Sequence, residues 1–321
     1  MQSIWNNIKE KNEMLALDKD ITRHIVVVGG GISGALCAFR LATGGRKVTL
    51  VEADTLYGGV THNTTAHLDA LQGYIYNDLV KISHQKARLY FKSQLDAIEE
   101  YQNFIDTYKI DCDFVRADSY MFTVNNLQKL REEFEAMKEI GAEVEFINQK
   151  LLNIENQGAI KLKDQAHFHP IKFLEGLPKN YEIIENTRVI KVDTKNKILY
   201  TPKAQIKADI IVIATGFPII DVPGLYFAKM YKSSSYSIAF RGGKLDGVYQ
   251  ADIENGLTYR SYGEYIIMGG LDHRTGRMDK QMKFERLKEK AAKSFGDNLE
   301  YTHNWSANDC MTADGIPYAG R

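Results

Sequence analysis

The clearest pattern in the chain is a set of short apolar runs without alternation, typical of strands buried on both faces of a parallel sheet. One such run, 24–29 (HIVVVG), leads into small and apolar residues, 35–45 (ALCAFRLATGG), which predict a helix ending in glycine. A second run follows at 47–52 (KVTLVE), and a third occupies 208–216 (ADIIVIATG). The pattern predicts a βαβ unit near the N-terminus and a sheet that resumes only at residue 208, so the α/β domain is split in sequence.

Amphipathic and alternating segments occupy most of the chain between and after these runs. Residues 84–110 and 126–141 repeat apolar positions with helical spacing, and the second stretch ends at Gly141, as helices often do. Strand character with aromatic residues and glycine-rich turns occurs in five further segments: 113–124, 233–240, 246–251, 256–261 and 264–270. These elements predict an antiparallel sheet floored by helices and inserted into the α/β domain.

The turn after the first predicted strand carries a phosphate-binding pattern. Gly29, Gly31 and Gly34 fill G-x-G-x-x-G between a strand and a helix, the context that this motif requires. The first glycine makes the tight turn, the second lets the backbone approach a pyrophosphate, and the third lets the helix pack on the strand. Glu52 ends the next strand about 20 residues after the last glycine, where an acid accepts hydrogen bonds from a ribose. The unit therefore predicts dinucleotide binding.

The segment after Glu52 favours FAD over NAD. A simple NAD domain would continue with a helix and a strand, but residues 53–73 (ADTLYGGVTHNTTAHLDALQG) are dense in Gly, Thr, Asn and His and predict a binding loop. The later strand ends in Ala214-Thr215-Gly216, small residues that let a cofactor approach closely. A nucleotide domain interrupted in this way is the arrangement of flavoproteins, and it argues against an NAD-dependent dehydrogenase.

Composition sets limits on partners. Lys+Arg and Asp+Glu are both 41, so no net field favours nucleic acid or an anionic membrane. The N-terminus is polar and no apolar run reaches the ~20 residues of a membrane span, so a cytoplasmic protein acting on a small molecule is expected. Cys37, Cys112 and Cys310 are too widely spaced for a disulfide framework and are expected to be ordinary buried thiols. His167 and His169 would share one face of a strand, but no third ligand is evident, so no metal is expected.

Several segments together resemble the D-amino-acid oxidase superfamily, which includes glycine and sarcosine oxidases. They are the glycine unit, the THNTTAH loop at 61–67, KDQAHFHPIKFLEGL at 163–177, ADIIVIATGFP at 208–218 and WSANDCMTADGIPYAGR at 305–321. The chain looks closest to the bacterial branch in which such an oxidoreductase is fused to a C-terminal Rieske domain, which has similar SxWL starts and DQAxFHP segments. The family segment Asp-Gly-x-Pro-x-x-Gly matches Asp314, Gly315, Pro317 and Gly320. In the family a further strand, a flavin loop and a helix follow it, whereas this sequence stops at Arg321.

The resemblance implies a fold and a domain division. The fold is a split Rossmann-like FAD/NAD(P)-binding domain of the glutathione-reductase type with an inserted α+β substrate domain. Residues 20–82, 155–225 and 300–321 are expected to form the FAD-binding domain, C-terminally incomplete, and residues 83–154 and 226–299 the substrate domain. The three scattered cysteines cannot supply a Rieske ligand set, so no Rieske domain is expected within these residues.

The resemblance also implies FAD as cofactor and a set of site residues. We call residues 29–34 the glycine loop and residues 61–67 the polar loop. The expected cofactor-binding residues come from these two loops, from the end of the later strand and from four further positions: Gly29, Gly31, Ile32, Ser33, Gly34, Thr61, His62, Thr64, Thr65, Ala66, Ala214, Thr215, Gly216, and then Glu52, Ala53, Val189 and Asp314. Some relatives attach the flavin through a histidine or cysteine, and His62 is the candidate for that, but non-covalent FAD is the interpretation adopted here, because the same loop would be polar in any flavoprotein.

The implied chemistry is hydride transfer from an amine-bearing carbon to flavin N5, giving an imine that water hydrolyses. Arg260, Tyr262 and His62 are the candidate catalytic residues, with Arg260 binding a substrate carboxylate if the substrate is an amino acid; a salt-bridged strand arginine is an equal alternative. The electron acceptor is unknown from sequence. A second hypothesis stays open, in which a truncated or degenerate flavin fold binds a nucleotide or a partner without turnover.

Overall fold

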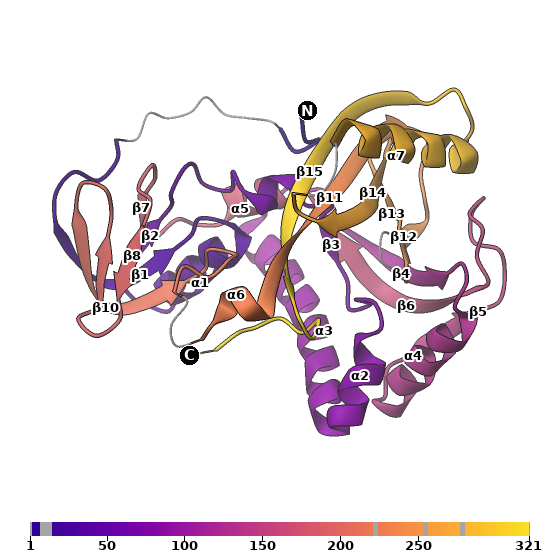
Figure 1. Cartoon of the computed structure of the whole chain (residues 1–321), viewed down its shortest axis with the longest axis horizontal. Coiled ribbons are helices and arrows are strands. Elements are labelled where there is room, and N and C mark those ends of the chain that lie inside the picture. The colour runs from indigo at the N-terminus through magenta and orange to yellow at the C-terminus, as the bar shows by residue number, and fades with distance from the viewer. Residues whose placement is uncertain (1, 7–14, 221–223, 253–255, 277–279, 321) are drawn as a thin grey trace.

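The computed structural model describes residues 2–6, 15–220, 224–252, 256–276 and 280–320. The chain folds into two bodies that lie side by side (Figure 1). One is built on a six-stranded sheet and the other on a nine-stranded sheet. We call them the nucleotide body and the substrate body. The chain passes repeatedly between them, so the split α/β arrangement predicted from the sequence is confirmed.

The nucleotide body contains the parallel strands predicted from the unbroken apolar runs. Its strand order is β7 (Glu182–Ile184), β2 (Val48–Val51), β1 (Ile21–Val28), β10 (Gln205–Ile213), β9 (Ile198–Tyr200) and β8 (Lys191–Asp193). The first four strands are mutually parallel, and the last two pair antiparallel. Helix α1 (Ile32–Thr43) covers the face that carries Val27, whereas Val26 faces the opposite apolar cluster with Leu199. Burial on both faces explains why the run lacks alternation.

The substrate body contains the nine-stranded sheet. Its order is β15 (Glu300–Thr312), β11 (Met230–Arg241), β14 (Tyr265–Arg274), β13 (Thr258–Tyr262), β12 (Gly247–Ala251), β4 (Val115–Thr123), β6 (Gly158–His167) and β3 (His67–Leu68), with β5 (Val144–Ile147) also paired to β6. All five segments predicted as strands are strands here. Most neighbours are antiparallel, but β12 and β4 pair in parallel.

Three strands lie in a different sheet from the one that the sequence suggests. The expected FAD-binding segments include 67–68, 155–167 and 300–312, yet β3 pairs with β6, β6 with β4 and β15 with β11, all in the nine-stranded sheet. The reason is long-range pairing: β15 hydrogen-bonds along the whole length of β11, from Met230 opposite Thr312 to Arg241 opposite Glu300. The domain division itself stays a prediction.

Helices cover the substrate sheet from two sides. The two predicted amphipathic helices are α3 (His84–Tyr108) and α4 (Leu127–Glu139), and they pack with α2 (Ile75–Ile82) in one apolar cluster below the sheet (Figure 1). Helix α7 (Lys280–Phe295) buries Phe284, Leu287 and Ala291 against the other face. Two short helices lie where the chain passes from one body to the other: α5 (Pro170–Gly176) between β6 and β7, and α6 (Tyr226–Lys229) between β10 and β11. All three cysteines are free, but only Cys112 is fully buried, so the expectation that Cys37 and Cys310 are buried thiols is wrong.

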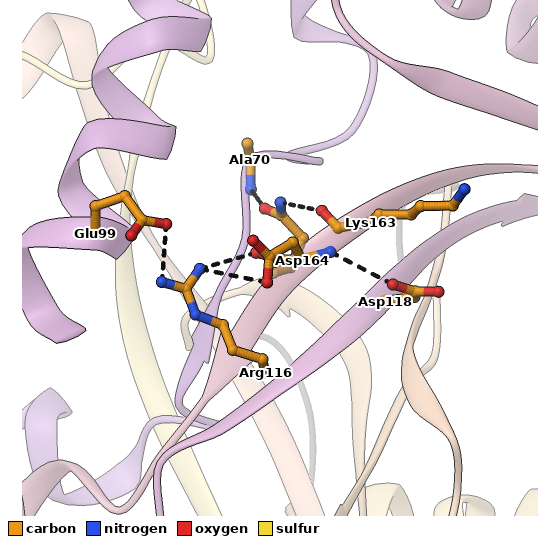
Figure 2. A network of polar contacts seen from close by, with 7 residues as sticks. Ala70, Glu99, Arg116, Asp118, Lys163 and Asp164 are labelled. Atoms are coloured by element: carbon orange, nitrogen blue, oxygen red, sulfur yellow. Dashed lines mark hydrogen bonds and ion pairs between the residues drawn. The ribbon is translucent and has the colours of Figure 1, made fainter.

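A β-bulge in β6 positions Gln165, which hydrogen-bonds the chain at Ala70, just after the polar loop and β3. The pairing of β4 with β6 shifts register at this point, and Asp164 has a φ of 59°. Figure 2 shows Arg116 joining Asp164 to Glu99 of α3, with an Nη2–Oε1 distance of 2.8 Å to Glu99. The next residue, Gln165, is 1% exposed and accepts the backbone N–H of Ala70 at 2.8 Å. An extra residue in one strand redirects the side chain that follows it. Here the redirected side chain is Gln165, whose hydrogen bond to Ala70 holds the segment just after β3.

Candidate FAD site

Two glycines of the motif are required by the protein itself. Gly29 has a φ of 110°, and a Cβ on it would lie 2.5 Å from the carbonyl oxygen of Ala214. A Cβ on Gly34 would lie 1.9 Å from the carbonyl oxygen of Gly29. The strand β1, the turn and helix α1 can therefore pack this closely only without side chains at these two positions.

Gly31 has no such requirement. Its φ is −74°, and the nearest atom to a Cβ placed on it is Thr61 Oγ1 at 3.3 Å. Gly31 is also the N-cap residue of α1 and has no side chain of its own to cap the helix, whose first turn contains no acidic residue; Thr61 Oγ1 accepts the N–H of Ile32 there. The lack of a side chain at Gly31 and the positive end of the helix dipole together fit a pyrophosphate lying against the backbone. The glycine loop therefore fits the ADP half of FAD.

Glu52 lies beside this loop at the end of β2. Its Oε2 accepts the N–H of Gly30 at 2.5 Å, and its Oε1 accepts the N–H of Asp54 at 2.9 Å. A carboxylate has about four lone-pair sites, so two stay available for ribose hydroxyls. In the connection between β7 and β8, Val189 is buried in the apolar cluster beneath the sheet, so any contact it makes with a nucleotide must come from its backbone.

The polar loop connects the glycine loop to the substrate body. Thr61, in a short 3-10 helix (Val60–Asn63), accepts the N–H of Ile32 at the start of α1, at 2.9 Å. The loop ends at Ala66, which has a φ of 56° and donates its N–H to Thr64 Oγ1 at 3.0 Å. The loop therefore runs from the glycine loop to the sheet of the substrate body.

Three successive carbonyls of this loop each accept a side-chain donor from elsewhere in the chain. Trp305 Nε1 donates to Asn63 at 3.0 Å and Trp5 Nε1 donates to Thr64 at 2.7 Å. The guanidinium Nε of Arg260 donates to the third carbonyl, that of Thr65, at 2.5 Å. These donors are buried, and they come from the N-terminal segment, β15 and β13. The backbone conformation of the loop is therefore set by both ends of the chain.

Arg260 is the centre of a buried polar cluster. Its side chain is 0% exposed, its Nη1 donates to His167 Nδ1 at 3.1 Å, and its Nη2 donates to the Phe168 carbonyl at 3.4 Å. Burial lowers the pKa of Arg260 to about 9, which leaves it charged at neutral pH. Its partners among the described residues are neutral acceptors, so the alternative of a salt-bridged strand arginine finds no ion pair there. The substrate-carboxylate role stays a prediction, and this position is closed to solvent.

Three histidines near this guanidinium are held neutral. Burial, with a smaller contribution from Arg260, lowers the pKa of His167 to about 3 and that of His169 to about 4, and places that of His67 well below its ordinary value. His167 ends β6, whereas His169 is the N-cap of α5, where its Nδ1 accepts the N–H of Lys172. The expectation that they share a strand face is therefore wrong, because the helix begins at Pro170.

Tyr262 and His62 lie on either side of this cluster. Tyr262 donates its hydroxyl to Asp113 Oδ2 at 3.0 Å, and its ring centroid is 5.0 Å from that of Trp5. His62 donates from Nε2 to Asn6 Oδ1 at 2.5 Å, and burial lowers its pKa. His62 follows Thr61 at the glycine end of the polar loop, whereas Arg260 holds Thr65 at the other end. Asn6, the partner of His62, and Trp5, which lies against Arg260 and Tyr262, connect the two ends.

The comparisons with known proteins identify the family. A family description, DAO, FAD dependent oxidoreductase, matches residues 24–321. The chain belongs to this family. FAD is therefore its cofactor. The glycine oxidase from Geobacillus kaustophilus has a similar fold, which superposes with a TM-score of 0.72 at 19% identity, covering 93% of this chain and 85% of that one.

Two proteins are similar to this DAO-family chain in sequence. One, YhfW of Bacillus subtilis (strain 168), is named for a Rieske 2Fe-2S iron–sulfur centre; it is 30% identical over 341 residues, covering 99% of this chain and 66% of that protein. The other is gamma-glutamylputrescine oxidoreductase of Escherichia coli (strain K12), 24% identical over 217 residues, covering 62% of this chain and 50% of that protein. The chain thus spans just under two thirds of the first relative and half of the second.

The remaining predicted site residues are distributed between the two ends of the site. Ile32, Ser33 and Ala53 lie at the glycine loop, and Ala214 joins it by donating its N–H to Val28 at 2.8 Å. Beyond Ala214, Thr215 donates its hydroxyl to Phe217, and Gly216 has a φ of 74°. Asp314 is exposed in the turn after β15, and among the described residues no hydrogen bond links it to the glycine loop. Its role in the site stays a prediction.

Sequence reasoning did not identify the residues that hold the polar loop. Trp5, Asn6 and Trp305 were not expected in the site, although they are the partners of Thr64, His62 and Asn63. The available signal was that the chain has only two tryptophans, one of them far upstream of the first strand. A buried tryptophan usually needs a hydrogen-bond acceptor for its N–H.

Neither a membrane-spanning helix nor a metal-binding cluster is found among the residues that the structure describes. No helix within the described ranges is both long enough and apolar enough to cross a bilayer. Within the same ranges, no group of three or more His, Cys, Asp or Glu side chains is arranged to hold a metal ion. The cytoplasmic location stays a prediction.

Proposed function

We propose that the chain oxidises an amine or amino-acid-like small molecule by hydride transfer to flavin N5. The observation that carries the proposal is the polar loop, which runs from the N-terminus of α1 to the buried cluster around Arg260. A bound FAD would extend from the glycine loop along this path and place its ring at the junction of the two bodies. Ligand sites commonly form at such junctions.

The residues around the flavin-ring end of the site would orient the substrate and supply electrostatic charge. Bound FAD supplies the hydride acceptor, and the protein supplies position and electrostatics. Arg260 is a buried charge whose recorded partners are all neutral acceptors, so it creates a positive potential near the loop. This potential favours an anionic group nearby, such as an amino-acid carboxylate. The neutral histidines add no positive charge that would repel a protonated amine on its way in.

The names of two related proteins support this substrate class. One relative is named for gamma-glutamylputrescine, an amine, and the similar fold belongs to a glycine oxidase. These names describe those proteins, and they guide the choice of compounds for this one. Amines and small amino acids are the first set to test, with 2-hydroxy acids as a matched set that lacks the nitrogen.

The test is anaerobic reduction of bound flavin. Purified chain loaded with FAD is mixed without oxygen with each compound, and loss of the visible flavin band is followed. This readout needs no knowledge of the electron acceptor. Bleaching by amines or amino acids and none by hydroxy acids is the expected result. Flavin that stays oxidised with every nitrogen compound, while dithionite reduces it, would contradict the proposal.

A second candidate function is ligand binding without turnover. It is favoured by the burial of Arg260, whose side chain is closed to solvent. Stoichiometric FAD uptake without bleaching by any compound supports this function. Protein that takes up no FAD at all overturns both.

A further inference from the structure

The segment that precedes the nucleotide-binding unit enters the flavin end of the site. Gln2 pairs with Asn304 of β15 in an isolated antiparallel bridge, which brings residues 2–6 against the sheet. Trp5 is 0% exposed although it lies close to the N-terminus. Its ring lies between Arg260, with the guanidinium carbon 5.2 Å from the ring centroid, and Tyr262, with centroids 5.0 Å apart. Such complete burial of a terminal residue needs a specific reason.

The side chains of Trp5 and Asn6 both hydrogen-bond to the polar loop. Trp5 Nε1 donates to the carbonyl of Thr64, and Asn6 Oδ1 accepts from His62 Nε2. Neighbouring carbonyls are held by Trp305 and Arg260. The loop thus has its carbonyls turned toward the protein. A peptide plane with its carbonyl pointing inward has its N–H on the opposite side.

We propose that Trp5 is a positioning residue for the FAD ring, and that residues 2–6 are a structural part of the flavin end of the site. By holding the Thr64 carbonyl, Trp5 keeps the polar loop in the conformation that accepts FAD before FAD arrives. Preorganisation raises affinity because less ordering is needed on binding. The inference rests on FAD binding at the glycine loop and adds a residue that the motif does not contain.

The proposal predicts different effects on the affinities for FAD and for ADP. ADP fills only the half that contacts the glycine loop and Glu52, whereas FAD also contacts the polar loop. Loss of the Trp5 hydrogen bond should therefore weaken FAD and leave ADP unchanged. One net hydrogen bond corresponds to roughly a 2- to 10-fold change in Kd. A general loss of stability would weaken both ligands alike.

The main experiment is a titration of flavin-free chain with FAD and with ADP. Trp5→Phe keeps an aromatic ring but removes the N–H donor. We expect its FAD Kd to rise by roughly 2- to 10-fold, with an unchanged ADP Kd and a shifted visible band of bound FAD. The matched control is Phe240→Leu, a buried aromatic in the α7 cluster that touches neither loop. This control should change neither Kd.

Asn6→Ala provides a second route if Trp5→Phe does not fold. Asn6 is half-buried, and its side chain accepts a hydrogen bond from His62 of the loop. A smaller rise in the FAD Kd, again without a change for ADP, is expected. Equal shifts for FAD and ADP, or no shift in either variant while native chain binds FAD, would overturn the inference. Native chain that binds ADP but not FAD would overturn both the inference and the proposed function.

Discussion

Gly34 lies directly against Gly29: a Cβ on Gly34 would stand 1.9 Å from the carbonyl oxygen of Gly29. This contact fixes how helix α1 leaves strand β1. Gly31, between them, makes no comparable contact, since its nearest neighbour would be Thr61 Oγ1 at 3.3 Å. Within one motif, therefore, two glycines are required by the fold, whereas the predicted role of the third is contact with the ligand.

The first prediction separates these duties. Gly31→Val should fold with nearly native stability but lose FAD and ADP binding, because its side chain fills the space for the pyrophosphate. Gly34→Ala should instead lower the free energy of unfolding by roughly 1–3 kcal/mol or more, as overpacking does. Thermal unfolding and ADP titration of both variants test this. Unchanged ADP affinity in a folded Gly31→Val would show that the loop is not the phosphate site.

The second prediction concerns Glu52. Glu52→Ala removes the acceptor of Gly30 N–H and Asp54 N–H together with the expected ribose contact. A hydrogen bond to a charged group contributes about 1.5–3 kcal/mol, so ADP affinity should fall by roughly 10- to 150-fold. Glu52→Gln keeps one acceptor oxygen and should lose less. Calorimetric titration with ADP measures both, and equal affinity for native and Glu52→Ala protein would exclude Glu52 as a ligand.

The parts of the fold that were predictable from sequence are those with local signals. The run at 24–29 and the spacing of Gly29, Gly31 and Gly34 specify strand, turn and helix within a short window, and the structure contains all three. Helices α3 and α4 are likewise encoded by their own periodicity. Such elements need no information from distant parts of the chain.

The remaining features depend on long-range pairing. β15 belongs to the substrate sheet because its partner is β11, which no pattern within residues 300–312 reveals. The surroundings of Arg260 are similar: its acceptors are the carbonyls of Thr65 and Phe168, contributed by two separate loops. Sequence placed Arg260 on the correct strand, but the direction of its guanidinium depends on backbone groups far away in the chain.

The third prediction distinguishes a structural from a substrate-binding Arg260. Arg260→Lys keeps the charge but cannot reach Thr65, Phe168 and His167 together, because an ammonium lacks the planar fork. If the loop depends on this fork, Arg260→Lys should lower the unfolding midpoint and weaken FAD binding. A variant with native stability and native FAD affinity, but with a raised KM for a carboxylate-bearing substrate, would instead support the substrate role. Urea unfolding and FAD titration come first, since neither needs a known substrate.

The fourth prediction is a loss of stability in mild acid, caused by the neutral histidines. His167 has its pKa lowered from 6.5 to about 3, so between these values the unfolded chain binds a proton that the folded chain does not. Stability therefore rises with pH across this window and falls on acidification below about pH 6.5. For His167 alone the loss from pH 6.5 to pH 5 is about 2 kcal/mol, and His169, with a pKa of about 4, adds a similar amount.

His167→Asn tests this effect without removing the acceptor for Arg260. Asn stays neutral at every pH and offers a carbonyl oxygen where Nδ1 accepts from Nη1. The measurement is the urea midpoint at pH 7 and pH 5, with FAD saturating in all samples. The native chain should lose more stability than the variant between these two pH values, by about 2 kcal/mol. If native chain and variant lose the same amount, His167 is not the group that stays unprotonated in the folded state.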